Sequence, residues 1–119
     1  MTPWTMLLVA AGGAVGSVLR FVVSTLFASP VAVFPWGTLV VNVVGSGLIG
    51  LAAGLGVSGE WRLFLVTGVL GGFTTFSAFS LETGVLWERQ WWLGVVYVGL
   101  TLVLGLGAFA VVFWHMGRR

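Results

Sequence analysis

The sequence has very little charge and no cysteine. Only 7% of its 119 residues are charged, whereas an average soluble domain has roughly 25%. Lysine and aspartate are both absent, so every basic residue is an arginine. Without cysteine the chain forms no disulfide, holds no thiolate-bound metal and performs no thiol chemistry. Because 59% of the residues are hydrophobic, a water-soluble domain of this length could not cover its core, and we predict a membrane protein.

Groups for catalysis or nucleic-acid binding are equally scarce. The single histidine, His115, lies close to the C-terminus, and no serine has a recognisable base and orienting group nearby in the sequence. The pI of 10.6 reflects a net charge of only +2, which does not amount to a basic surface for nucleic acid. We therefore predict that the chain is not an enzyme and does not bind nucleic acid.

Four segments are long and apolar enough to span a membrane as helices, since a span needs about 20 residues. They are expected at about residues 5–27, 38–57, 61–86 and 92–114. Tryptophan prefers the membrane interface, and all seven tryptophans fall near a proposed end: Trp4, Trp36, Trp61, Trp87, Trp91, Trp92 and Trp114. The first segment lacks a basic region before it, so we expect a retained helix rather than a cleaved signal. The whole chain, residues 1–119, is predicted to be one all-α, multi-pass transmembrane domain.

The arginines indicate an orientation only weakly. Arg62, Arg118 and Arg119 belong to the side that carries both termini, while Arg89 lies opposite and Arg20 approaches that side from within the first segment. This small bias favours cytoplasmic termini. So weak a signal also allows a chain that inserts both ways round.

The third segment contains a stretch that suits a continuous helix poorly, Gly71-Gly72-Phe73-Thr74-Thr75. Paired glycines are poor helix formers, and threonine hydroxyls can bond the local backbone instead. We predict a break near the middle of the membrane. Non-helical backbone at that depth has to be buried in protein or line a polar cavity, so the break is a candidate functional site.

Small residues are spaced for close helix packing. Gly12 and Gly16 form one G-x-x-x-G pair, and Gly50 and Gly54 form another. Such pairs let membrane helices approach closely. Four short helices leave little room for a water path of their own, so we expect oligomerisation if the chain transports a solute.

Polar residues inside the segments recur at helical spacing. Thr38, Asn42 and Ser46 form one stripe, and Tyr97 and Thr101 form another. Each hydroxyl alone could simply bond its own helix, but an asparagine amide needs both donor and acceptor partners. These stripes fit either packing or a shared polar path.

The donors available to such a path favour an anion. Phe76 and Phe79 lie on one face of the second half of the third segment and can present positive ring edges. The other donors are hydroxyls, the Asn42 amide and the Arg20 guanidinium. The acidic side chain nearest the interior is Glu82, about two turns after the break. The residues alone therefore indicate a small membrane protein with a possible anion pathway, and they do not identify the anion.

Three motifs extend this conclusion through a resemblance. The stretch from Gly71 to Phe79, GGFTTFSAF, closely resembles the third-segment signature of the Fluc (CrcB) fluoride channels. The same family shows the pattern GGAVGSVLR of residues 12–20 and the pattern GTLVVNVVGS of residues 37–46. The likeness covers the whole chain, including its length and its four segments.

The resemblance implies an antiparallel homodimer in the cell (inner) membrane, with two fluoride pores and a structural sodium ion at the dimer axis. The backbone carbonyls of Gly71 and Thr74 match the family's sodium ligands. The family's fluoride pathway matches Asn42, Phe76, Ser77, Phe79, Tyr97 and Thr101, and its vestibule or electrostatic positions match Arg20 and Glu82. Gly105 stands where some members continue the hydroxyl track.

The implied function is passive, electrogenic and fluoride-selective export, which relieves fluoride toxicity. Fluoride is strongly hydrated, so a selective path has to replace its water with close donors. Two alternatives remain from the residues. A small multidrug-type exporter should carry a glutamate deep in its first segment, where this chain has only Arg20 as a charge. In a non-transporting membrane assembly protein the stripes would serve packing alone.

Overall fold

All regular elements within residues 1–28 and 33–117, the part of the chain that the computed structural model describes, are helices. They are α1 (Pro3–Leu26), α2 (Trp36–Gly54), α3 (Gly59–Arg62), η1 (Leu63–Leu70), α4 (Gly71–Phe73), α5 (Phe76–Arg89) and α6 (Trp91–Gly117). Four stretches are long and apolar enough to cross a membrane: Pro3–Leu26, Trp36–Gly54, Gly59–Arg89 and Trp91–Gly117. The prediction of an all-helical chain with four such helices is confirmed.

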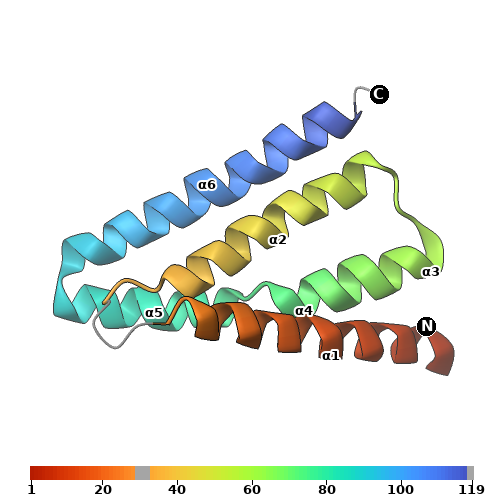
Figure 1. Cartoon of the computed structure of the whole chain (residues 1–119), viewed down its shortest axis with the longest axis horizontal. Helices are drawn as coiled ribbons and strands as arrows, with labels where there is room; N and C mark the ends of the chain where they lie inside the picture. The colour runs from red at the N-terminus through yellow and green to blue at the C-terminus, as the bar shows by residue number, and fades with distance from the viewer. Residues whose placement is uncertain (29–32, 118–119) are drawn as a thin grey trace.

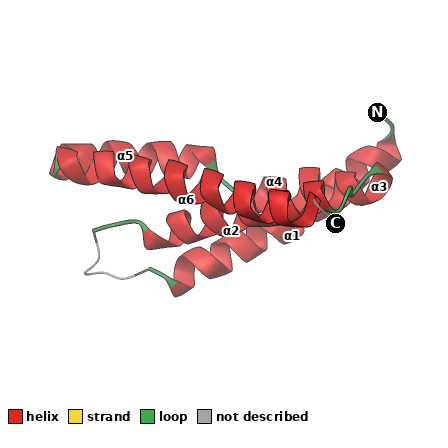
Figure 2. Cartoon of the chain, turned by 90° about the horizontal axis from the view of Figure 1, so that it is seen from above, coloured by secondary structure: helices red, strands yellow, loops and turns green. Residues whose placement is uncertain are grey.

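The chain runs back and forth along its long axis, so both termini lie at the same end (Figure 1). The α5–α6 turn and the start of α2 lie at the opposite end. The α2 helix packs against α6, while α1 packs against η1 and α4. Helix α5 also contacts α6. Figure 2, viewed from above, shows only helices and loops, and no strand, in the described part of the chain.

Local signals set where the helices begin and end. Helix α1 begins earlier than the expected residue 5, because Thr2 and Thr5 form a reciprocal capping box and Pro3 occupies the first turn. Helix α2 ends at Gly54, before the expected Val57. Gly56 there has a φ of +71°, a left-handed conformation that favours glycine and ends helices.

The helix of the third span is interrupted at Thr74 and Thr75, whose backbones are extended (φ, ψ of −82°, 155° and −148°, 121°). The expectation that the paired glycines would themselves be non-helical is wrong, because Gly71 and Gly72 belong to α4. Gly72 serves close packing instead: a Cβ there would lie 2.6 Å from the carbonyl oxygen of Gly13. The sequence also did not predict that η1, just before the break, is a π-helix.

Glycines form two seams between helices. In the seam between α1 and η1, a Cβ on Gly12 would collide with the carbonyl oxygen of Phe64. In the seam between α2 and α6, a Cβ on Gly50 would lie 2.7 Å from the carbonyl oxygen of Phe109. Both G-x-x-x-G pairs therefore pack helices within one chain.

A small buried core lies between α2, α5 and α6. Leu39, Phe79, Leu86 and Tyr97 form it, and α2 is the most buried of the four spans. Most of the surface of α1 and α6 is exposed and apolar, as expected for helices that face lipid. The described residues exclude 29–32 and 118–119, so the first connector at Ser29 and Pro30 and the tail arginines Arg118 and Arg119 lie outside them.

Candidate functional site

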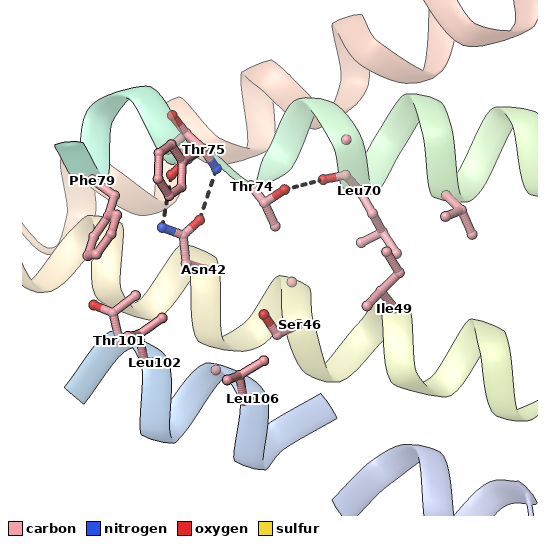
Figure 3. Close-up of a pocket in the computed structure, with 15 residues that line it drawn as sticks. Asn42, Ser46, Ile49, Leu70, Thr74, Thr75, Phe79, Thr101, Leu102 and Leu106 are labelled. Carbon is pink, nitrogen blue, oxygen red and sulfur yellow. Dashed lines mark hydrogen bonds between the residues drawn. The ribbon is translucent and has the colours of Figure 1, made fainter. Parts of the chain in front are cut away.

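A groove of about 350 Å³ lies beside the break in the third span. We call it the central groove. Its walls come from α2, from η1 and the residues after it, and from α6 (Figure 3). The lining residues are Asn42, Gly45, Ser46, Ile49, Val66, Leu70, Gly71, Thr74, Thr75, Phe76, Phe79, Thr101, Leu102, Gly105 and Leu106. Residues from both predicted polar stripes and from the predicted break therefore meet here.

Asn42 holds the extended backbone of the break. Its side-chain Nδ2 donates to the carbonyl oxygen of Thr75 at 3.0 Å, and its Oδ1 accepts from the Thr75 N–H at 2.9 Å. Figure 3 shows this two-point pair, which spans α2 and the break. A Cβ on Gly45, one turn along α2, would collide with the methyl group of Thr74. The glycine thus allows the break to lie directly against α2.

The two phenylalanines of the second half-helix lie side by side but differ in exposure. Their ring centroids are 5.6 Å apart. Phe79 is buried and its ring lies 5.2 Å from that of Tyr97, whereas Phe76 is 78% exposed on the single chain. Both rings line the central groove. One ring therefore belongs to the core of the chain, and the other is left uncovered.

A second cavity, of about 330 Å³, lies between α1, α2 and α5. We call it the Arg20 cavity. Arg20 and Glu82 both line it, together with Ser17, Phe21, Ser24, Thr38, Thr75 and Ala78. Thr75 lines the central groove as well. Thr75, in the non-helical backbone of the break, therefore lies between the mostly apolar central groove and a cavity lined by a guanidinium and a carboxylate.

The Glu82 carboxylate is held by two hydroxyls from two other helices. Thr38 donates to Oε1 at 2.9 Å, and Tyr97 donates to Oε2 at 3.1 Å. Both donors are buried. Hydrogen bonds to an ionised acceptor are the stronger kind, so the pair supports a carboxylate within an apolar chain.

The remaining predicted hydroxyls differ in their surroundings. The hydroxyl oxygen of Thr101 is buried and has no hydrogen-bond partner among the described residues. The Ser77 hydroxyl is exposed and lies 3.2 Å from the hydroxyl of Thr75. Thr101 lines the central groove, and its hydroxyl is a donor without a partner among the described residues.

The backbone carbonyls of Gly71 and Thr74 lack the N–H donors that a continuous helix would give them. In a continuous helix they would accept from the N–H groups of Thr75 and Ala78. Here the Thr75 N–H donates to Asn42, and the Ala78 N–H donates to the Thr75 hydroxyl at 3.1 Å. Among the described residues, no cluster of three acidic or histidine side chains offers another metal site. Carbonyl oxygens freed from the helix ladder therefore fit the donor set of a cation such as Na⁺.

The structure adds three residues that the sequence-based site did not include. Thr38 holds Glu82, and Ser17 and Ser24 line the Arg20 cavity. The signal for Thr38 was its place one turn before Asn42. The signal for the two serines was their spacing from Arg20, three residues before it and four residues after it, which places them on one helix face.

Comparisons with known proteins agree on one family. The model of the family described as CrcB-like protein, Camphor Resistance (CrcB), matches residues 7–113. A relative from Agrobacterium fabrum, named fluoride-specific ion channel FluC, is 54% identical over 110 residues, which cover 85% of this chain and 86% of the relative. Relatives with the same name occur in Rhizobium meliloti (51% identical over 89% of each chain) and in Hyphomonas neptunium (46% identical over 95% of this chain and 94% of the relative).

Proposed function

Because this chain belongs to the CrcB-like family, we propose that it is a fluoride-specific ion channel that lets fluoride leave the cell passively and so relieves fluoride toxicity. The observation that carries this proposal is the high identity, over most of both chains, to relatives named fluoride-specific ion channel. The four apolar helices agree with it. We place the protein in the cell (inner) membrane, surrounded by lipid.

The break lies near the middle of the bilayer in this proposal. Thr74 and Thr75 are midway between Gly59 and Arg89, the ends of the third span. Hydrocarbon cannot satisfy the backbone groups of extended residues. The pairing of Thr75 with Asn42 supplies partners for the N–H and the carbonyl of Thr75.

The fluoride pathway follows the two cavities. The Arg20 cavity is the mouth, where the guanidinium raises the local concentration of anions. Beyond Thr75, the ring edges of Phe76 and Phe79 and the hydroxyls of Ser77, Tyr97 and Thr101 replace the water around the ion. The unpartnered hydroxyl of Thr101 supports this role. Tyr97 donates to Glu82, so fluoride and the carboxylate would compete for the same proton.

The pathway is completed by a second copy in an antiparallel homodimer. Phe76 is 78% exposed and Gly71 is exposed on the single chain, although both line the central groove. A second copy across this groove would cover the ring and turn an open groove into an enclosed path.

A sodium ion at the dimer axis would be held by the carbonyl oxygens of Gly71 and Thr74 from both copies. Its role would be structural, because it would neutralise four carbonyl dipoles and join the two chains. The diverted N–H groups described above support these ligands. A bound cation stabilises the state that binds it by RT ln(1 + [cation]/Kd), so the stability rises with the logarithm of the cation concentration.

Fluoride efflux from liposomes tests the proposal. Purified protein is reconstituted into vesicles loaded with potassium fluoride, and release is followed with a fluoride electrode after addition of valinomycin. We expect efflux that requires valinomycin, because an electrogenic channel needs a countercharge, and no efflux from chloride-loaded vesicles. Efflux that depends on a proton gradient would favour an exporter, and no efflux at all would favour an assembly role.

A further inference from the structure

We infer that Asn42 is a positioning residue for the cation site, because its amide holds Thr75 in a conformation that frees the carbonyl oxygens of Gly71 and Thr74. This role differs from lining the fluoride pathway. It rests on the proposed sodium site, and the experiment below separates the two.

The helix ladder of the third span stops at one identifiable residue. The carbonyl oxygen of Leu70 accepts from both the N–H and the hydroxyl of Thr74, each at 3.0 Å. The next N–H along the chain, that of Thr75, would reach Gly71 in a continuous helix. Instead it donates to Asn42 Oδ1 at 2.9 Å. Asn42 thus accepts from the N–H that would otherwise donate to the Gly71 carbonyl and continue the helix.

The second carbonyl is freed as a consequence of the same pair. Once Thr75 is extended (φ −148°, ψ 121°), it serves as the N-cap of α5, and its hydroxyl accepts from the Ala78 N–H. In a continuous helix that N–H would bond the carbonyl of Thr74. Asn42 stabilises the extended backbone from the other side, by donating to the Thr75 carbonyl. One amide on α2 therefore maintains both cation ligands.

The two halves of the Asn42 amide have separable roles. The acceptor, Oδ1, diverts the Thr75 N–H, and the donor, Nδ2, satisfies the Thr75 carbonyl. Aspartate keeps an acceptor of the same shape and loses the donor, whereas alanine loses both. If the diverted N–H is what frees Gly71, aspartate should preserve the cation response and alanine should not.

The experiment measures sodium-dependent thermal unfolding of the purified full-length protein in detergent. The seven tryptophans provide the fluorescence signal, and sodium replaces choline at constant ionic strength. Wild type should unfold at higher temperature as sodium rises. The fit of this rise to RT ln(1 + [Na⁺]/Kd) gives the sodium concentration at half-saturation of the site, Kd. Asn42→Ala should raise that half-saturation by at least about tenfold, the effect of losing one good hydrogen bond. Asn42→Asp should stay at the wild-type value or below it.

Ser46→Ala is the matched control. Ser46 lies one turn along α2 and lines the same groove, so its loss changes the groove wall without touching Thr75. It should leave the sodium half-saturation unchanged. If Asn42→Ala fails to fold, Asn42→Asp tests the inference alone, and a folded aspartate variant without a sodium response would overturn it.

The outcomes distinguish this inference from the proposed sodium site. If the unfolding temperature of wild type does not change with sodium, the proposed sodium site is wrong. The proposed fluoride channel is then still tested separately by the efflux experiment. If wild type responds and Asn42→Ala keeps the wild-type half-saturation, the positioning role of Asn42 is wrong while the sodium site survives. Equal weakening in Asn42→Ala and Ser46→Ala would also overturn the role, because it would indicate a general effect of packing along α2.

Discussion

Glu82 illustrates how single residues make a carboxylate acceptable inside an apolar chain. Its two oxygens accept from Thr38 and Tyr97, and its remaining surface faces the Arg20 cavity. The cost of burying a charge falls when hydrogen bonds and a polar cavity surround it. We call the Thr38 and Tyr97 hydroxyls the Glu82 clamp. The clamp holds the carboxylate beside the proposed mouth of the pathway.

Removing either donor of the clamp should destabilise the protein. We expect Thr38→Val and Tyr97→Phe each to cost about 1.5–3 kcal/mol, the usual net value of a hydrogen bond to a charged group. Unfolding in mixed micelles measures the loss, and a double-mutant cycle gives the coupling through Glu82. Thr101→Val is the contrast, because its hydroxyl has no partner among the described residues. A loss at Thr101 as large as that at Thr38 would contradict this assignment.

Substitution of the two phenylalanines should distinguish a role in the fluoride pathway from a role in core packing. Phe76→Leu should suppress fluoride efflux and leave the stability of the single chain nearly unchanged, because the ring is 78% exposed there. Phe79→Leu should suppress efflux and also cost about 1 kcal/mol, since it loses ring contact with Tyr97 in the core. Liposome efflux and thermal unfolding measure the two effects. Wild-type efflux from both variants would remove the role proposed for the ring edges.

Among the elements, α1 and η1 pack more closely than side chains would allow. A Cβ on Gly16 would collide with the carbonyl oxygen of Val69, and one on Gly68 would lie 2.8 Å from the Cα of Gly12. The helix that carries the break therefore lies directly on the backbone of α1. The η1 segment, which precedes the break, is a π-helix, a form that is rare and frequent at functional sites.

Two neighbouring glycines of α1 test this seam. Gly12→Ala should destabilise the protein by about 1–3 kcal/mol, because the added methyl would collide with the carbonyl of Phe64. Gly13→Ala is the matched control, since a Cβ there meets nothing within 4 Å. Alanine also favours helix by up to about 1 kcal/mol, so the control should be neutral or slightly stabilising. Unfolding midpoints compare the two variants. Equal losses of stability would show that the close contact at Gly12 does not limit the size of the side chain there.

At the scale of the whole molecule, the proposed antiparallel dimer requires chains in both orientations. The connector at Ser58 lies at the end that carries the termini, and Gln90 lies at the opposite end. Both residues are exposed. An antiparallel pair would place one copy of each site on either side of the membrane.

The absence of cysteine makes this arrangement measurable. Ser58→Cys and Gln90→Cys, each the sole cysteine of its variant, can be treated in cells with a maleimide that does not cross the inner membrane. We expect about half of each variant to react from outside, as an antiparallel homodimer demands. Complete reaction of one variant with none of the other would show a single orientation and contradict the proposed dimer.

The sequence by itself determined the class and the number of candidate membrane spans. Few charges and apolar stretches of about 20 residues favour helices, which satisfy their own backbone within a bilayer, and tryptophans mark their ends. The motifs around Gly12, Asn42 and Gly71 were sufficient for the family, because their order and spacing are specific. They also contain residues of the second and third spans that line one groove in the structure.

Only the tertiary structure decided where the helix breaks and which side chains contact one another at the site. The helix stops at Thr74 and Thr75 rather than at Gly71 and Gly72, because the glycines are needed for contact with α1 and Asn42 captures the backbone of Thr75. Thr38 and Tyr97 reach Glu82 from different helices. Such pairings depend on which helix faces join across the bundle, and helical periodicity within one segment carries no information about its partner.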